Sequence, residues 1–173
     1  MRRSIGLLLG VAALTTLAVV GIVTLTRPGA AAIAKGQPVP NVAGTTIDGR
    51  SFDLSAYRGH PVVINFWGPS CVPCITEFPL LEAKAKEHAA DGLVIVGVLT
   101  DDAPDPARAF VAKYGGTWPT VIDPGAALKK AYAVVGRPQT YFVDRSGILR
   151  SIQIGEVEDQ DFERQYGLIS GAS

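Results

Sequence analysis

The sequence is poor in the residues that build disulfide scaffolds and metal clusters, since its 173 residues include only two cysteines and two histidines. Two cysteines cannot staple a small fold together, and with two histidines they are a poor supply of metal ligands. Charge of one sign is also lacking, because 16 Lys and Arg balance 16 Asp and Glu. Without a basic excess no nucleic-acid partner is expected. Since 47% of residues are hydrophobic and 18% charged, we expect an ordinary globular domain with no metal or cofactor.

The N-terminal end differs from the rest of the chain. Residues 1–27 contain three arginines and no acidic residue, and residues 5–26 form an uncharged stretch of 22 residues. As a helix this stretch would be about 33 Å long, enough to cross a hydrocarbon core of about 30 Å. Residues 1–27 are therefore predicted to be a membrane anchor or signal. The small residues at 29–34 leave cleavage and secretion open, but the length favours a single-pass anchor with an extracytoplasmic body.

The rest of the chain alternates between strand and helix patterns. Residues 28–40, rich in Ala, Gly and Pro, are predicted to be a linker, and 41–173 a single domain. The expected elements are a hairpin of 45–47 and 51–53, strand 62–66, helix 74–90, strand 93–99, helices 106–114 and 126–134, a hairpin of 140–143 and 149–154, and helix 159–169. This alternation predicts an α/β fold in which helices cover both faces of a mixed sheet.

Chemistry is expected at the Cys-Val-Pro-Cys sequence of residues 71–74. It follows a predicted buried strand and opens a predicted helix. The positive end of a helix stabilises a thiolate, so Cys71 would be nucleophilic near neutral pH. Cys74, one turn further, could then attack a mixed disulfide formed on Cys71. The pattern indicates a redox-active disulfide.

Three other interpretations of the cysteines compete with this one. A zinc site would need two more ligands, and neither His60 nor His88 is spaced as a ligand pair. A purely structural disulfide would gain little from so short a loop. Two unrelated buried cysteines would not explain their position between a strand and a helix. A redox function is favoured over all three.

The sequence around the cysteines resembles a known family. Residues 62–67 read Val-Val-Ile-Asn-Phe-Trp, Cys-Val-Pro-Cys follows at 71–74, and 77–79 read Glu-Phe-Pro. Further on, Gly-Arg-Pro-Gln-Thr at 136–140 precedes a predicted strand. As a set, these motifs resemble the TlpA/ResA/CcmG group of thioredoxin-like thiol–disulfide oxidoreductases, within the AhpC/TSA–redoxin superfamily.

The resemblance covers roughly residues 37–169, which is nearly the whole body. It implies a thioredoxin-like fold, in which a mixed central sheet is flanked by helices, for the domain 41–173. It also implies an N-terminal β-hairpin and a central insertion at about 101–121. Members of the group are membrane-anchored and extracytoplasmic, and they usually act as reductases.

The resemblance also implies roles for individual residues. Cys71 would be the attacking thiol and Cys74 the resolving one. Pro138 would be cis, pack against the disulfide and expose the backbone of Arg137 for pairing with an extended substrate peptide. Glu77 matches an acidic position of the group and would assist proton transfer, or would only favour the start of the helix.

Other residues near the motif support the site or have alternative roles. Trp67 would flank and shield the cysteine pair, or would be a core aromatic. Pro73, between the cysteines, is expected to support the site. Arg137 would stabilise the Cys71 thiolate or select an acidic substrate segment, or would be a solvated surface side chain. Asn65 stands where cytoplasmic thioredoxins have a buried Asp.

The predicted function is therefore reduction of disulfides in exported proteins, apocytochrome c among the candidates. Electrons would come from an integral-membrane donor of the CcdA/DsbD type, and the N-terminal segment would hold the protein at the membrane. Two alternatives share the fold: a peroxiredoxin-like antioxidant peroxidase and a metal-delivery module. The peroxidase would need Thr or Ser where Gly68 stands, and the metal module a distant His that the chain lacks after His88.

Overall fold

The computed structural model describes residues 33–171. These residues belong to one compact unit. The predicted anchor at 1–27 therefore lies outside the described residues. Among residues 33–171, no helix is both long enough and apolar enough to cross a membrane.

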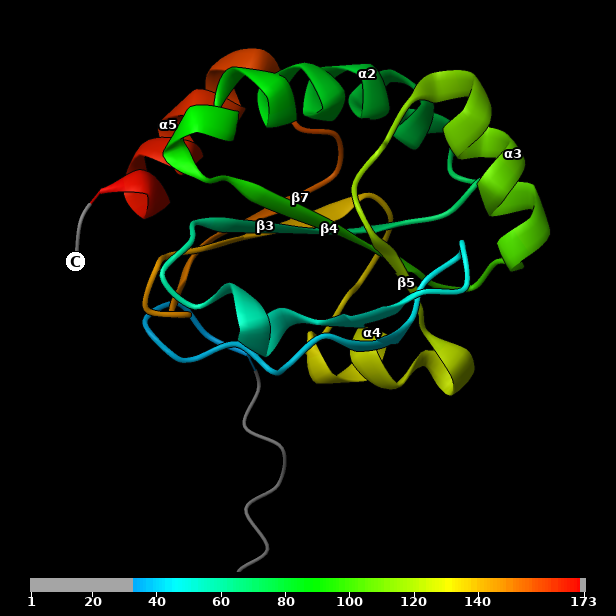
Figure 1. The fold of residues 1–173 in the computed structure, drawn as a ribbon, viewed down its shortest axis with the longest axis horizontal. Helices are drawn as coiled ribbons and strands as arrows, with labels where there is room; N and C mark the ends of the chain where they lie inside the picture. The colour runs from blue at the N-terminus through cyan, green and yellow to red at the C-terminus, as the bar shows by residue number, and fades with distance from the viewer. Residues whose placement is uncertain (1–32, 172–173) are drawn as a thin grey trace, which may run out of the picture. The chain divides into compact units, whose positions relative to one another are not determined.

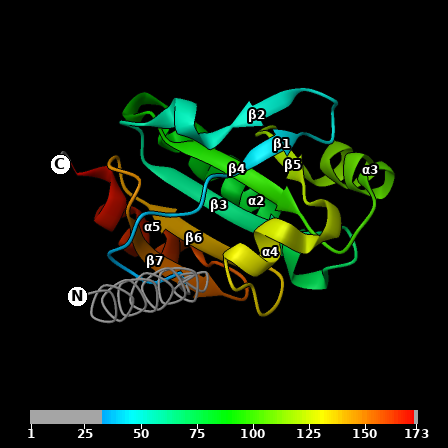
Figure 2. The same ribbon diagram turned by 90° about the horizontal axis from the view of Figure 1, so that it is seen from below.

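A five-stranded sheet forms the centre of the domain, in the order β5-β4-β3-β6-β7 (Figures 1 and 2). The strands are β3 (Val62–Trp67), β4 (Val94–Leu99), β5 (Thr120–Ile122), β6 (Gln139–Val143) and β7 (Leu149–Ile154). Strands β3, β4 and β5 are parallel, whereas β6 and β7 pair antiparallel. Every residue of β3 is buried, as expected of a β-branched strand that is covered on both faces. The predicted α/β class and mixed sheet are confirmed.

Helices lie on both faces of this sheet (Figure 1). One face is covered by α2 (Val72–Glu87), α3 (Pro104–Tyr114) and α5 (Asp159–Ser170), with a short turn η2 (Ala89–Asp91) after α2. The other face carries α4 (Ala127–Ala131), the turns η1 (Leu54–Tyr57) and η3 (Pro124–Ala126), and the hairpin β1 (Ala43–Thr45) and β2 (Ser51–Asp53). Because side chains alternate along a strand, the domain has two hydrophobic clusters, one on each face. The predicted hairpin is confirmed, although its first strand lies two residues earlier.

Two helices begin two residues before their predicted starts. Helix α2 begins at Val72, so Pro73 lies in its first turn, and α3 begins at Pro104. Proline is tolerated in the first turn because the N–H it lacks would have no partner there. Helix α2 ends at Glu87 rather than at residue 90.

The helix after residue 126 and strand β5 also differ from the predicted elements. The helix expected at 126–134 shortens to Ala127–Ala131, because Ala126 and Ala133 have φ angles of 56° and 52°, in the left-handed region. Strand β5 was not predicted, since its three residues are too few for a pattern to be recognised. It lies at the end of the predicted central insertion, which also contains α3.

The described part of the predicted linker lies against the body. Gly36 N–H donates to Leu149 O at 2.8 Å, and Leu149 N–H donates to Gln37 O at 2.9 Å. Val39 N–H donates to Gly147 O at 3.1 Å. These bonds bring residues 36–39 alongside the start of β7.

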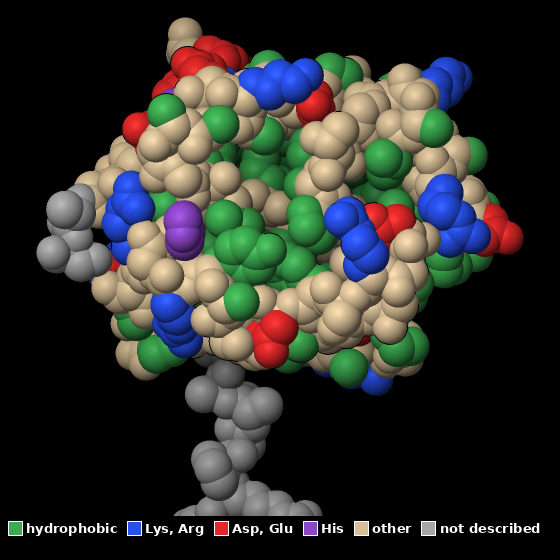
Figure 3. Space-filling view, in the orientation of Figure 1, with side chains coloured by type: hydrophobic (Ala, Val, Ile, Leu, Met, Phe, Trp, Pro, Cys, Tyr) green, Lys and Arg blue, Asp and Glu red, His purple; other side chains and the backbone are tan. Residues whose placement is uncertain are grey.

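One edge of the sheet is partly open. Strand β5 pairs only with Gly97–Leu99, so the first half of β4 has no neighbour on that side. Figure 3 shows a hollow beneath α2, and a cavity of about 260 Å³ lies there, lined by Tyr57, Ala85, Leu93, Val94, Ile95, Thr117, Trp118 and Pro119. The cysteines follow the carboxyl end of β3, so this hollow lies toward the other end of the parallel strands.

Candidate functional site

The two cysteines form a disulfide where β3 passes into α2. Cys71 is the N-cap of α2 and is 6% exposed, whereas Cys74 lies in the first turn and is fully buried. The first turn of α2 contains no acidic residue. No carboxylate of the first turn therefore offsets the positive end of the helix dipole at Cys71. This helix end would stabilise a thiolate on Cys71.

Glu77 lies one helical turn beyond Cys74 and is fully buried. The side chain of Asn65 donates to Glu77 Oε2 at 2.9 Å, and Val157 N–H donates to Oε1 at 3.1 Å. Burial raises the pKa of Glu77 to about 7, although these two hydrogen bonds act in the opposite direction. A carboxyl with such a pKa can both accept and release a proton near neutral pH.

A row of small and polar residues crosses the sheet on the face that α2 covers. The strand register places in it, from β5 to β7, Thr120, Gly97, Asn65, Thr140 and Gln153. Asn65 Nδ2 donates to Thr140 Oγ1 at 2.9 Å as well as to Glu77, so both of its amide hydrogens are used. A Cβ at position 97 would come within 2.5 Å of Thr120 Oγ1 and 2.7 Å of Trp67 Nε1, so glycine is required there. Asn65 is the member of this row that holds the Glu77 carboxylate, and Thr140 fixes the orientation of the Asn65 amide.

A charged network lies on the side of Cys71. Arg137 Nη1 donates to Thr100 O at 2.6 Å and to Asp102 Oδ2 at 2.5 Å, and Nη2 donates to Ser70 Oγ at 3.0 Å. The Ser70 hydroxyl in turn donates to Asp102 at 2.8 Å. The side chains of Arg137 and Asp102 are each only 18% exposed. Arg137 is therefore not a solvated surface side chain, which was one of its predicted roles.

The structure also describes the other predicted residues, Pro138, Trp67 and Pro73. The Arg137–Pro138 peptide bond is cis, which confirms the predicted geometry. Trp67 is fully buried, with ring centroids 4.5 Å from Phe78 and 5.1 Å from Phe110. It belongs to the hydrophobic cluster that also contains both cysteines. Trp67 is thus a core aromatic of this cluster, and Pro73 lies in the helix turn between the cysteines.

Ser70 and Asp102 are the site residues that the sequence reading did not single out. Asp102 follows the carboxyl end of β4, and the cysteine loop follows the carboxyl end of β3. Since the carboxyl ends of neighbouring parallel strands meet at one edge of a sheet, the order of elements contained this signal. No such signal marked Ser70, because serine is common as an N-cap before any helix.

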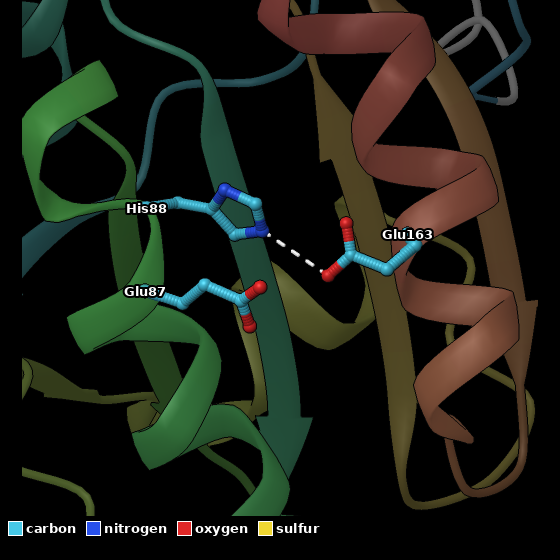
Figure 4. Close-up of side chains that lie close together, drawn as sticks. All are labelled: Glu87, His88 and Glu163. Carbon is cyan, nitrogen blue, oxygen red and sulfur yellow. Dashed lines mark hydrogen bonds and ion pairs between the residues drawn. The ribbon is translucent and has the colours of Figure 1, made fainter.

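One of the two histidines, His88, lies far from the cysteines. His88 follows the last residue of α2, so it is more than about 20 Å from the cysteines at 1.5 Å per helical residue. Figure 4 shows Glu87 and His88 facing Glu163 of α5, with their ligand atoms within 4.8 Å of one another. The Lys84 ammonium lies 2.9 Å from Glu87 and 2.5 Å from Glu163. This cluster is thus an ion-pair network that fastens α2 to α5, and His88 does not form a zinc site with the cysteines.

Comparison with known proteins agrees with this geometry. The AhpC/TSA family matches residues 35–152. Thiol-disulfide oxidoreductase ResA of Geobacillus kaustophilus (strain HTA426) is 32% identical over 133 residues, which cover 77% of this chain and 76% of ResA. Thioredoxin-like protein YneN of Bacillus subtilis (strain 168) is 32% identical over 139 residues, covering 79% and 81%.

A solved structure shows the same fold. The thiol:disulfide interchange protein of the thioredoxin family from Chlorobium tepidum TLS superposes with a TM-score of 0.72 at 25% identity. The match covers 81% of this chain and 100% of that one. Sequence, fold and the Cys71–Cys74 disulfide together show that the chain belongs to the AhpC/TSA family, as a thioredoxin-like thiol–disulfide oxidoreductase.

Proposed function

We propose that this thiol–disulfide oxidoreductase works as a reductase of disulfides in exported proteins, with Cys71 as the attacking thiol and Cys74 as the resolving one. The observation that carries the proposal is the unequal burial of the pair at one helix end. Cys71 is 6% exposed and Cys74 is 0% exposed. A substrate sulfur can therefore approach Cys71, whereas Cys74 can be reached only from within the protein.

The reaction runs in two exchanges that move two electrons to the substrate. The Cys71 thiolate attacks one sulfur of the substrate disulfide, and the other substrate sulfur leaves as a thiolate that takes up a proton. Cys74 then attacks the Cys71 sulfur of the mixed disulfide, and the second substrate thiolate leaves. The protein is left with the Cys71–Cys74 disulfide, and the substrate with two thiols.

Glu77 is proposed to take the proton that Cys74 loses in the second exchange. It lies three residues after Cys74 on α2, and residues three apart share a helix face. Its raised pKa, about 7, lies between that of an ordinary carboxyl and that of a thiol, so the transfer is close to balanced. Asn65 and Val157 hold the carboxyl in place while the proton moves.

We infer the location and the partners from the N-terminal sequence and from the family. Residues 1–27 are proposed to anchor the protein in the membrane, with the domain on the extracytoplasmic side. An integral-membrane donor of the CcdA/DsbD type would return two electrons to the disulfide after each cycle. Apocytochrome c is proposed as one of the substrates, because the resemblance is to a group that includes cytochrome-maturation proteins.

The position of Gly68 favours disulfide exchange over peroxidase chemistry. A peroxidatic cysteine at 71 would need Thr or Ser at 68. A Cβ at this position would collide with the side chains of Arg137 and Asp102. Consumption of hydrogen peroxide by the reduced protein, at a rate that competes with disulfide reduction, would reverse this preference.

The reduction potential of the Cys71–Cys74 pair tests the proposed direction. We would equilibrate the full chain, purified in detergent, in glutathione and dithiothreitol redox buffers. A potential near or below about −220 mV supports a reductase, whereas a value near about −120 mV marks an oxidant. If no intramolecular disulfide forms at any potential, the dithiol mechanism is wrong.

A further inference from the structure

The network beside Cys71 holds the Arg137 guanidinium from several sides. Besides the Asp102 carboxylate, Thr100 O and Ser70 Oγ accept hydrogen bonds from it at 2.6 Å and 3.0 Å. Ser70 directly precedes Cys71. Since two of the acceptors are uncharged, the guanidinium would stay beside Cys71 even if Asp102 lost its charge.

Asp102 cancels this positive charge in the native protein. Burial alone would raise the pKa of Asp102, but hydrogen bonds from Ser70 and Arg137 outweigh it and lower that pKa below its ordinary value. Asp102 is therefore ionised at neutral pH, and its carboxylate lies 2.5 Å from the guanidinium that it neutralises. The pair is packed on the loop that leads to the cysteines, because its side chains occupy the space next to Gly68 Cα.

The exposed residues that adjoin the network in the sequence include two valines, besides the polar Ser70 and Asp101. Val72, next to Cys71, is 74% exposed, and Val135, two residues before Arg137, is 76% exposed. A neutralised ion pair with exposed valines near it offers little attraction to a charged substrate segment. An uncharged or apolar segment meets no such penalty.

We propose that Asp102 is a specificity-determining residue, which neutralises Arg137 so that Cys71 accepts disulfides flanked by uncharged residues and does not select acidic ones. The inference rests on the proposed function and adds a substrate class to it. It also predicts opposite effects for the loss of the Asp102 charge and the loss of the Arg137 charge. Loss of the Asp102 charge creates a cationic site beside Cys71, and loss of the Arg137 charge creates an anionic one.

Two alkylating reagents of different charge test the local potential without any substrate. The reduced full chain would be treated with iodoacetate, an anion, and with iodoacetamide, which is neutral, and the two rates compared. Because Cys74 is buried, the rates report on Cys71. In Asp102→Asn the iodoacetate-to-iodoacetamide ratio should rise about threefold to tenfold, as expected for one unscreened charge several ångströms away. In Arg137→Gln it should fall by a similar factor, and Arg137→Lys should restore it in part.

Asp101→Asn is the matched control. It removes the same charge from the next residue, but the Asp101 carboxylate pairs with Lys129 at 2.5 Å. Its left-handed φ of 61° is one that asparagine tolerates. The reagent ratio in this variant should stay at the wild-type value, and circular dichroism should show all variants folded.

Two disulfide peptides, alike except for Glu or Gln beside each cysteine, then test the substrate class. The wild type should reduce both at similar rates, and Asp102→Asn should prefer the Glu peptide several-fold. An unchanged reagent ratio in Asp102→Asn overturns this inference alone. A shifted ratio with no peptide reduced by the wild type contradicts the proposed function, and with it the substrate class.

Discussion

Two carboxylates near the cysteine pair, Glu77 and Asp102, show how the same chemical group takes different roles. Glu77 is fully buried and is held by an amide and a backbone N–H, so burial raises its pKa to about 7. Asp102 lies nearer the surface, where Ser70 and Arg137 lower its pKa. One carboxyl can therefore exchange a proton at neutral pH, and the other is a fixed negative charge. The difference lies in the depth of burial and in the charge of the partners that the fold supplies.

The largest effect is expected from substitution of the cysteines. Cys74 is paired with Glu77 in this comparison, and Cys71 with Asp102. Cys71→Ser should lower disulfide reduction by more than about a thousandfold, since the attacking sulfur is lost. Cys74→Ser should also stop turnover, but it should accumulate a covalent mixed disulfide between Cys71 and the substrate. Mass spectrometry of the trapped adduct distinguishes the two. An adduct that forms in Cys71→Ser and not in Cys74→Ser would reverse the assigned roles.

Glu77→Gln should slow release of the second substrate thiol about a hundredfold at pH 7, because Cys74 then lacks its proton acceptor. Glutamine keeps the size of the side chain and the hydrogen bond from Val157. The difference from wild type should shrink from pH 7 to alkaline pH, because hydroxide can then remove the thiol proton without Glu77. Stopped-flow measurement of thiol release across this pH range provides the test. A constant rate ratio at all pH values would mean that Glu77 is only structural.

The same residue should give the oxidised protein an unusual dependence of stability on pH. The folded-state pKa of Glu77, about 7, lies above its ordinary value of 4.5, so the folded protein holds the extra proton between these values. Its contribution to the free energy of unfolding therefore falls as pH rises from about 4.5 to about 7, by about 3 kcal/mol in total. Glu77→Gln should lack this loss. Urea unfolding of both proteins at pH 4.5 and pH 8 measures the difference, and parallel curves would contradict it.

The contribution of Asp102 to the free energy of unfolding should change with pH in the opposite direction, and its effect should be the smallest. Its folded-state pKa is lowered, so its stabilisation is complete above an ordinary Asp pKa of 3.8 and is lost as pH falls through the folded-state value. Because the pair is partly exposed, Asp102→Asn should cost about 1 kcal/mol or less near pH 7. Urea unfolding at pH 7 and pH 3 would show the variant and wild type converging at the lower pH. A gap that widens there would contradict the ion pair.

Much of the buried part of the site, around Cys74 and Glu77, could be predicted from the sequence. The run at 62–67 is hydrophobic enough to specify a buried strand, and a strand followed directly by a helix fixes where Cys71 and Cys74 lie. Glu77 follows Cys74 at helical spacing, so its closeness to the pair is a local property of the chain. These residues needed no knowledge of distant contacts.

The charged network of Ser70, Asp102 and Arg137 depends on contacts between residues far apart in the sequence. Arg137 meets Asp102 across 35 residues and Ser70 across 67. These contacts follow from the strand order of the sheet, in which β6 runs antiparallel to β3, and no local pattern encodes that arrangement. The burial of Arg137 and its ion pair with Asp102 could therefore be recognised only in the folded structure. The short strand β5 was missed for the same reason, since its pairing with β4 defines it.

Titration of the Glu77 side-chain carboxyl by ¹³C NMR in the oxidised full chain tests the central claim most directly. Glu77→Gln would identify its resonance. The account predicts a midpoint near pH 7, set by the burial of this carboxyl between α2 and the sheet. A midpoint near the ordinary value of 4.5 would show that this carboxyl holds no proton at neutral pH, and the assigned proton transfer from Cys74 would be wrong.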